Sequence, residues 1–284
     1  MLVRYFIHFF LFFYLLSSYK AEAQYNEIGF MFGASNYKGE LSRHIFNTDF
    51  LHPAIGLFYR HNRDRRWSWK VELNYGRISG NDAKAKTPFE IDRNLSFYSD
   101  ILEISPQIEF NFLTFETGRS DYPFTPYLFT GLSVFHFNPK AKLGNDDFEL
   151  QPLGTEGQGI NGNNRYKRIQ FAIPIGGGIK VSVGNIGIGL EVGARRTYTD
   201  YLDDVSTLYP DMTALLASNG PLAVALSDRS FSRSDTTADI RNAFKKQRGN
   251  STDKDWYLFT SITVFWRLSS TLRDICEPFK RRRY

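Results

Sequence analysis

The chain contains 284 residues with a formal net charge of +5, and Cys276 is its single cysteine. One thiol excludes an internal disulfide, so the fold must hold without covalent staples. We expect no nucleic-acid partner, because attraction to anionic lipid head groups or to acidic proteins accounts better for this charge in an exported chain.

The N-terminus has the pattern of a secretory signal peptide. Arg4 precedes an apolar run from Tyr5 to Leu16, and Ala21-Glu22-Ala23 forms a small-residue cleavage site. The apolar run is shorter than the about 20 residues that a transmembrane helix needs. We therefore predict that residues 1–23 are removed on export and that the mature chain starts at Gln24. Later apolar runs are also too short for such a helix.

Strict alternation predicts β-strands along the mature chain. In residues 67–76, Trp67 and Val71 fall on one face while Lys70 and Glu72 fall on the other. In a soluble sandwich the apolar face would form the core, whereas in an outer-membrane barrel it would face lipid. Eight strands are expected, at residues 27–37, 53–61, 67–76, 102–112, 125–137, 170–183, 186–193 and 256–268.

The connections between these strands alternate between long and short. The connections at 38–52, 79–97, 138–169 and 199–254 are long, and those at 61–66, 116–125 and 184–185 are shorter. Outer-membrane barrels sort their connections in this way, with short periplasmic turns and long external loops. We predict an all-β, eight-stranded antiparallel transmembrane β-barrel over residues 24–269, with one loop partly helical. Both termini, including a basic tail at 270–284, would lie in the periplasm.

The charged faces of these strands predict the interior of the barrel. An eight-stranded barrel is just wide enough for its own side chains to fill it, so channel activity is not expected. No cofactor and no catalytic or metal residue is assigned. The predicted interior residues are Lys70, Glu72, Glu103, Glu109, Lys180, Glu191 and Arg195.

Several segments resemble the PorG-type barrel proteins of the type IX secretion system. They are QYNEIGFMFGASNYKGEL at 24–41, NLSFYSD at 94–100, PYLFTGLSVFHFNP at 126–139, ELQPLGTEGQG at 149–159, IPIGGGIK at 173–180 and RTYTDYLDDVSTLYPD at 196–211. The string TDYLDDVS is the most specific of them. The resemblance implies a non-enzymatic outer-membrane component that works with the periplasmic ring of the secretion core complex, formed by a lipoprotein and its partner subunit. Such systems export cargo proteins and, in some bacteria, gliding adhesins.

The acidic part of this string has two interpretations. We expect a structural corner, with a helix starting near Asp200, acids in its first turn and Tyr198, Tyr201 and Tyr209 plugging the barrel mouth. A calcium site is the sharper alternative, although the spacing lacks the pattern of an EF-hand loop. The motif consists of Thr199, Asp200, Tyr201, Leu202, Asp203, Asp204, Val205 and Ser206.

Two basic clusters fall on the predicted periplasmic side. They can be solvated ends that contact lipid phosphates, or they can dock onto an acidic face of the ring subunits, where charge steers encounter. The clusters are Arg63, Asp64, Arg65 and Arg66 in a short turn, and Lys280, Arg281, Arg282 and Arg283 in the tail.

The main alternative is a lipid-modifying barrel enzyme, a hydrolase or acyltransferase. Nucleophilic catalysis needs a serine and a histidine within hydrogen-bond reach. Ser133 and His136 are three residues apart on one strand and therefore fall on opposite faces. The glycines at 176–178 lack the Lys-Ser/Thr of a P-loop, so we interpret them as packing residues.

Overall fold

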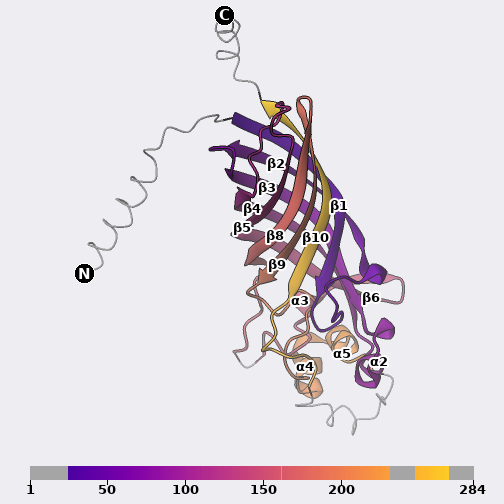
Figure 1. Ribbon diagram of the computed structural model, residues 1–284. Helices are drawn as coiled ribbons and strands as arrows, with labels where there is room; N and C mark the ends of the chain where they lie inside the picture. The colour runs from indigo at the N-terminus through magenta and orange to yellow at the C-terminus, as the bar shows by residue number, and fades with distance from the viewer. Residues whose placement is uncertain (1–24, 161, 231–246, 269–284) are drawn as a thin grey trace, which may run out of the picture.

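The chain forms a closed β-barrel with loops and short helices gathered at one end (Figure 1). The computed structural model describes residues 25–160, 162–230 and 247–268. The predicted signal peptide and the basic tail lie outside these residues, so both stay predictions. Within the described residues the sheet has ten strands: seven each form one full stave of the ring, two shorter ones together form the eighth, and one adds a hairpin. The elements are β1 (Tyr25–Lys38), η1 (Thr48–Phe50), β2 (His52–Asn62), β3 (Trp67–Asn81), η2 (Asp82–Lys84), α2 (Pro88–Arg93), β4 (Ser96–Asn111), β5 (Phe124–Gly131), β6 (Ser133–Leu143), β7 (Asp146–Glu149), α3 (Leu150–Leu153), β8 (Ile169–Val183), β9 (Ile186–Thr197), α4 (Met212–Asn219), α5 (Pro221–Ser227) and β10 (Trp256–Leu268).

The ring closes between the first and last strands, which pair antiparallel from Asn26↔Leu268 to Lys38↔Trp256. The strands β5 and β6 follow one another along β4 and together make one stave. Their pairing with β4 keeps the same register on both sides of the break between them, as Gln107↔Gly131 and Ile104↔Val134 show. A short strand, β7, adds a hairpin to β6. The predicted eight-stranded antiparallel ring is therefore confirmed, and the two additional strands come from the break and the hairpin.

Short and long connections alternate around the ring as predicted, and they collect at opposite ends. Figure 1 shows the start of β1, the end of β10 and the β8–β9 turn at one end, which we call the turn end. The helices α2 to α5 lie at the other, which we call the loop end. The expected partly helical loop is confirmed by α4 and α5 in the last long connection.

None of the helices among the described residues is long and apolar enough to cross a membrane.

The two faces of the barrel wall carry opposite chemistry. On β3, Trp67, Trp69 and Tyr75 are each close to half exposed, while the alternate residues Lys70 and Glu72 are buried in the interior. The same division holds around the ring. Large apolar side chains that face outward include Phe30, Phe32, Ile55, Leu57, Leu102, Ile104, Leu128, Phe171, Ile175, Ile188, Leu190, Ile262 and Trp266. This belt is the outer surface expected of a barrel that sits in lipid.

The core of the molecule fills the loop end of the barrel. Aromatic residues from the wall, such as Phe135 and Tyr257, pack against Leu150, Leu202 and Leu226 from the two longest connections. The loops therefore close the mouth of the barrel with their own apolar side chains. A smaller cluster of Phe58, Phe115 and Phe265 lies toward the turn end.

Candidate functional site

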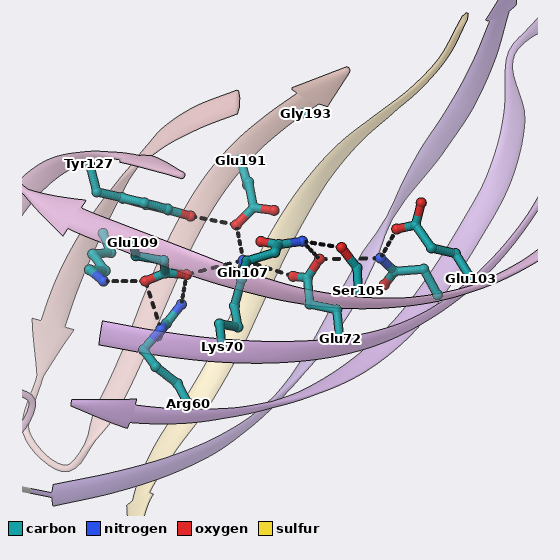
Figure 2. Close-up of polar contacts among 12 residues, drawn as sticks. Arg60, Lys70, Glu72, Glu103, Ser105, Gln107, Glu109, Tyr127, Glu191 and Gly193 are labelled. Carbon is teal, nitrogen blue, oxygen red and sulfur yellow. Dashed lines mark hydrogen bonds and ion pairs between the residues drawn. The ribbon is translucent and has the colours of Figure 1, made fainter. Parts of the chain in front are cut away.

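The interior of the barrel is filled by a network of ion pairs (Figure 2). Glu109 on β4 accepts from three cations: Arg60 and Lys180 at 2.9 and 3.0 Å from its Oε2, and Lys70 at 3.1 Å from its Oε1. Lys70 also lies 2.8 Å from Glu191. Because each of these charges is buried, their mutual pairing is what makes the burial tolerable.

A second part of the network lies closer to the loop end. Arg195 of β9 lies 3.3 Å from Glu103 and 3.7 Å from Glu72, and the hydroxyl of Tyr257 donates to Glu103. The prediction of the seven charged interior residues is confirmed. Arg60 and Glu27, which pair at 2.9 Å, were missed. Arg60 was within reach of sequence reasoning, because it lies two residues after Phe58 on the inward face of a predicted strand.

The connection between β4 and β5 folds back and covers the turn end. Phe115, Glu116 and Thr117 are all buried there, and Thr117 donates to Glu27 in the interior. The carboxylate of Glu116 is held by three guanidinium groups, those of Arg65, Arg119 and Arg267, each at 3.1 Å. The barrel is thus covered at both ends as well as filled along its length.

The predicted docking turn between β2 and β3 is partly occupied with internal contacts. Asp64 accepts from the backbone N–H groups of Arg66 and Trp67 at 2.7 and 2.8 Å, which fixes the turn. Arg65 pairs with Glu116, and Arg66 donates to the carbonyl of Phe112 at 3.0 Å while remaining exposed. Docking by this turn stays a prediction. Lys280, Arg281, Arg282 and Arg283 lie outside the described residues.

The acidic motif at 199–206 forms a compact corner at the loop end, but the helix expected near Asp200 is absent. Among the described residues of this connection, the first helix is α4, which begins at Met212 behind the N-cap Asp211. Local side-chain bonds replace the helical turn. Asp203 accepts from the N–H of Val205 at 2.9 Å, Asp200 accepts from Ser206 at 2.7 Å, and Asp204 has a left-handed φ of 65°. Such bonds offer the backbone an alternative to a helix.

The tyrosines of this segment divide between the corner and the surface. Tyr201 stacks on Tyr166 with ring centroids 4.7 Å apart, and Tyr209 belongs to the core under α4 and α5. Tyr198 is 62% exposed, so the expectation that it helps to plug the mouth is wrong. It occupies an outward position after β9, where strand alternation directs it away from the interior.

Arg248 connects the two longest connections through the corner. Its Nη1 lies 2.9 Å from Glu156 and 2.6 Å from the carbonyl of Asp204, and its Nε donates to Ser227. Burial raises the pKa of Asp204 to about 6, against the opposing attraction of Arg248. Burial also raises the pKa of Asp203 to about 7. The structural role of the motif stays a prediction, and these contacts are its basis.

The serine, histidine and glycine candidates can now be placed. Ser133 is buried and donates to the carbonyl of Ala172, whereas His136 is exposed on the other face, as predicted. The glycine packing is also confirmed. A Cβ at Gly176 would lie 2.4 Å from the ring of Phe129, and one at Gly178 would lie 2.2 Å from the carbonyl of Leu190.

Among known families, the chain matches the one described as "Domain of unknown function (DUF6089)" over residues 6–219. The chain belongs to this family. No curated protein matches the sequence.

Several solved bacterial barrels are similar to this DUF6089 member. Neisserial surface protein A aligns with a TM-score of 0.43, the attachment invasion locus protein Ail of Yersinia pestis with 0.41, and the N-terminal β-barrel domain of Pseudomonas aeruginosa OprF with 0.36. Each is 9% identical and is covered in full by 87% of this chain. The fold assignment stands on the strand pairing itself.

Proposed function

We propose that this DUF6089 member is a non-enzymatic outer-membrane component of the type IX protein secretion machinery, which anchors or assembles the periplasmic ring of the core complex. The observation that carries the proposal is the filled barrel. The lumen is occupied by Arg60, Lys70, Glu109 and their partners. A partner can therefore bind only to the lipid-facing wall or to one of the two ends of the barrel.

The membrane assignment rests on the chemistry of the wall. Outward-facing apolar side chains and a buried polar interior invert the arrangement of a soluble barrel, and outer-membrane lipids are the matching surroundings. The start of β1, the end of β10 and the short turns share one end, which by the usual sorting of loops would face the periplasm.

The partner is supplied by the resemblance of segments such as TDYLDDVS to PorG-type proteins. The proposed contact is with the ring lipoprotein and its partner subunit, made by the turn end. Arg63 and Arg66 lie in the turn between β2 and β3, and Arg66 is exposed. Basic side chains at such a rim would steer an acidic partner more than they would add affinity.

The test is capture of the ring subunits from native outer membranes by a tagged barrel. Arg63→Glu combined with Arg66→Glu is the informative variant, because it leaves the Arg65–Glu116 contact in place. We expect reduced recovery of the ring lipoprotein and reduced export of cargo. The matched control reverses Lys142 and Lys167, two exposed lysines of the 138–169 connection, and should leave recovery unchanged. Full secretion and unchanged ring recovery in a strain that lacks the protein would refute the proposal.

A lipid-modifying enzyme is the second candidate, and one contact favours it. His52 at the start of β2 and Ser79 near the end of β3 approach to 2.7 Å between Nε2 and Oγ. Both lie toward the loop end, where an external lipid would be reached. The pair lacks the carboxylate that orients a catalytic histidine: the nearby Asp100 instead forms a two-pronged pair with Arg77. Unchanged mass of the membrane lipids on expression of wild type and Ser79→Ala would exclude this activity.

A further inference from the structure

The loop end contains a group of carboxylates that come together from three separate parts of the chain. Glu40 follows β1, Asp200 follows β9 and Asp255 precedes β10. Each offers an oxygen atom, and these oxygens lie within 4.8 Å of one another. Asp255 is fully buried and Asp200 is 3% exposed. We propose that Glu40, Asp200 and Asp255 bind a divalent cation, with calcium as the matching ion.

Two buried carboxylate oxygens of the group have no partner. Oδ1 of Asp200 and Oε2 of Glu40 form no hydrogen bond with any described residue. The remaining oxygens of the two side chains are occupied, by the hydroxyl of Ser206 and by the N–H of Asn250. An unpartnered buried carboxylate oxygen is costly unless another positive group meets it. A cation coordinated by the cluster would satisfy both atoms.

The protein supplies little positive charge of its own to this group. Within residues 25–160, 162–230 and 247–268, no ion pair joins the three carboxylates to a lysine or arginine, in contrast to Asp204 nearby, which has Arg248. The hydroxyl of Tyr37 bridges Asp255 and a further acid, Asp203, at 3.2 and 2.6 Å.

Calcium matches a cluster of protein carboxylates better than magnesium does. Calcium binds six to eight oxygens at about 2.3–2.6 Å, so two ligands on opposite sides of one ion are roughly 4.8 Å apart. Magnesium, with bonds of about 2.0–2.1 Å, usually keeps several waters and is rarely held by protein groups alone. Backbone also approaches closely: a Cβ at Gly39 would lie 2.1 Å from Oδ1 of Asp255. A side chain at position 39 would therefore collide with the carboxylate of Asp255, and glycine avoids this collision.

Of the three carboxylates, Glu40 borders a cavity. Glu40 and Gly39 line a cavity of about 600 Å³ that also contacts Asp253, Lys254 and Trp256. Lys254 acts on Asp200 electrostatically, but its ammonium group donates to the carbonyl of Ser251 at 2.9 Å. Lys254 is therefore a competitor of the cation, and its removal should strengthen binding.

Terbium luminescence tests the site directly, because Tyr37 and Trp256 lie close enough to sensitise a bound ion. The full chain, refolded in an uncharged detergent, should show sensitised emission that calcium displaces with a Kd of about 10⁻⁴–10⁻³ M, the range of extracellular modules. Asp200→Asn and Glu40→Gln should each weaken calcium binding by at least about tenfold, since each removes a charged ligand. Lys254→Met should tighten it by roughly two- to fivefold.

Asp204→Asn is the matched control, because Asp204 is a buried acid of the same corner but is satisfied by Arg248, Thr155 and Tyr166. Its calcium affinity should equal that of the wild type. A shift in gel mobility on heating verifies that each variant has folded. If Asp200→Asn does not fold, the partly exposed Glu40→Gln carries the test. Absence of calcium binding by the wild type at about 10 mM, well above this range of affinities, would overturn the proposal. Equal affinity in wild type and Glu40→Gln would also overturn it.

Discussion

Nζ of Lys70 lies 2.8 Å from Oε2 of Glu191, although 121 residues separate them in the sequence. Their strands are as far apart as the ring allows, because β2, β1 and β10 lie between β3 and β9 in one direction and β4, the β5–β6 stave and β8 lie between them in the other. The contact therefore crosses the whole interior. A second ion pair, between Arg195 and Glu72 at 3.7 Å, joins the same two strands.

This cross-lumen network should dominate the stability of the barrel. Glu109→Ala leaves Arg60, Lys70 and Lys180 without their shared carboxylate, and breaking a buried pair in this way costs about 3–5 kcal/mol. Asp100→Ala, which removes the exposed pair with Arg77, should cost at most about 1 kcal/mol. Urea unfolding in phospholipid vesicles measures both variants. Equal losses would mean that the interior charges are not energetically coupled.

The proposed orientation predicts a pattern of chemical labelling on intact cells. In a Cys276→Ser background, cysteines replacing Asn145 in the β6–β7 turn and Ser218 in α4 should react with an impermeant thiol reagent. A cysteine replacing Asn185 in the β8–β9 turn should not react until the outer membrane is opened. All three positions are exposed, so accessibility alone does not separate them. The reverse pattern would place the turn end outside.

Removal of Arg248 should loosen the loop end without opening the barrel. Arg248→Ala deletes the contact to Glu156 that joins the two longest connections, together with the contacts to Asp204 and Ser227 within the last of them. We expect proteolytic cleavage in the 199–254 connection to become at least about tenfold faster, because local opening is governed by the contacts of the segment itself. Heat-modifiable gel mobility should persist. A variant that cleaves at the wild-type rate would show that the packing of Leu202 and Leu226 suffices.

The staves of the barrel could be predicted from the sequence because each carries its own signal. In β3, period-two alternation from Trp67 onward fixes both the strand and the face that turns inward, and parity of loop lengths fixes the topology. The break at Leu132 left no such signal. It lies opposite Pro106, whose missing N–H removes a hydrogen bond from the ladder, and that pairing is visible only once the register is known.

The candidate sites were harder to predict, because they depend on contacts between distant segments. The acids of TDYLDDVS suggested a first helical turn, yet Asp203 is bound by Tyr37 from the other end of the chain. Likewise, Asp200 lies beside Glu40 and Asp255, and neither neighbour is signalled by the motif itself. The basic turn at 63–66 appeared available for a partner, but part of it faces Glu116 from a different connection.

The stability of the corner should depend on pH through Asp204, because burial raises the pKa of this carboxyl to about 6 in the folded protein. An unfolded aspartate has a pKa of about 3.9. Between these two pKa values the folded state holds the proton of Asp204 more tightly than the unfolded state does. The stabilisation that this proton gives the folded protein is therefore fully present below about pH 4 and is lost as the pH rises through 6. Each pKa unit corresponds to about 1.4 kcal/mol, which gives a loss on the order of 2–3 kcal/mol across the window.

Asp204→Asn isolates this contribution. The variant carries no titratable group at position 204. The difference in unfolding free energy between wild type and variant should therefore change by the about 2–3 kcal/mol given above from pH 4 to pH 7, and should stay constant above pH 7. The measurement is urea unfolding with calcium chelated, which keeps Glu40 and Asp200 in the same state in both proteins. Asp146→Asn in the exposed β6–β7 turn serves as the surface control. A wild-type minus variant difference that does not vary between pH 4 and pH 7 would contradict this prediction, because it would show that Asp204 stays charged beside Arg248 over the whole range.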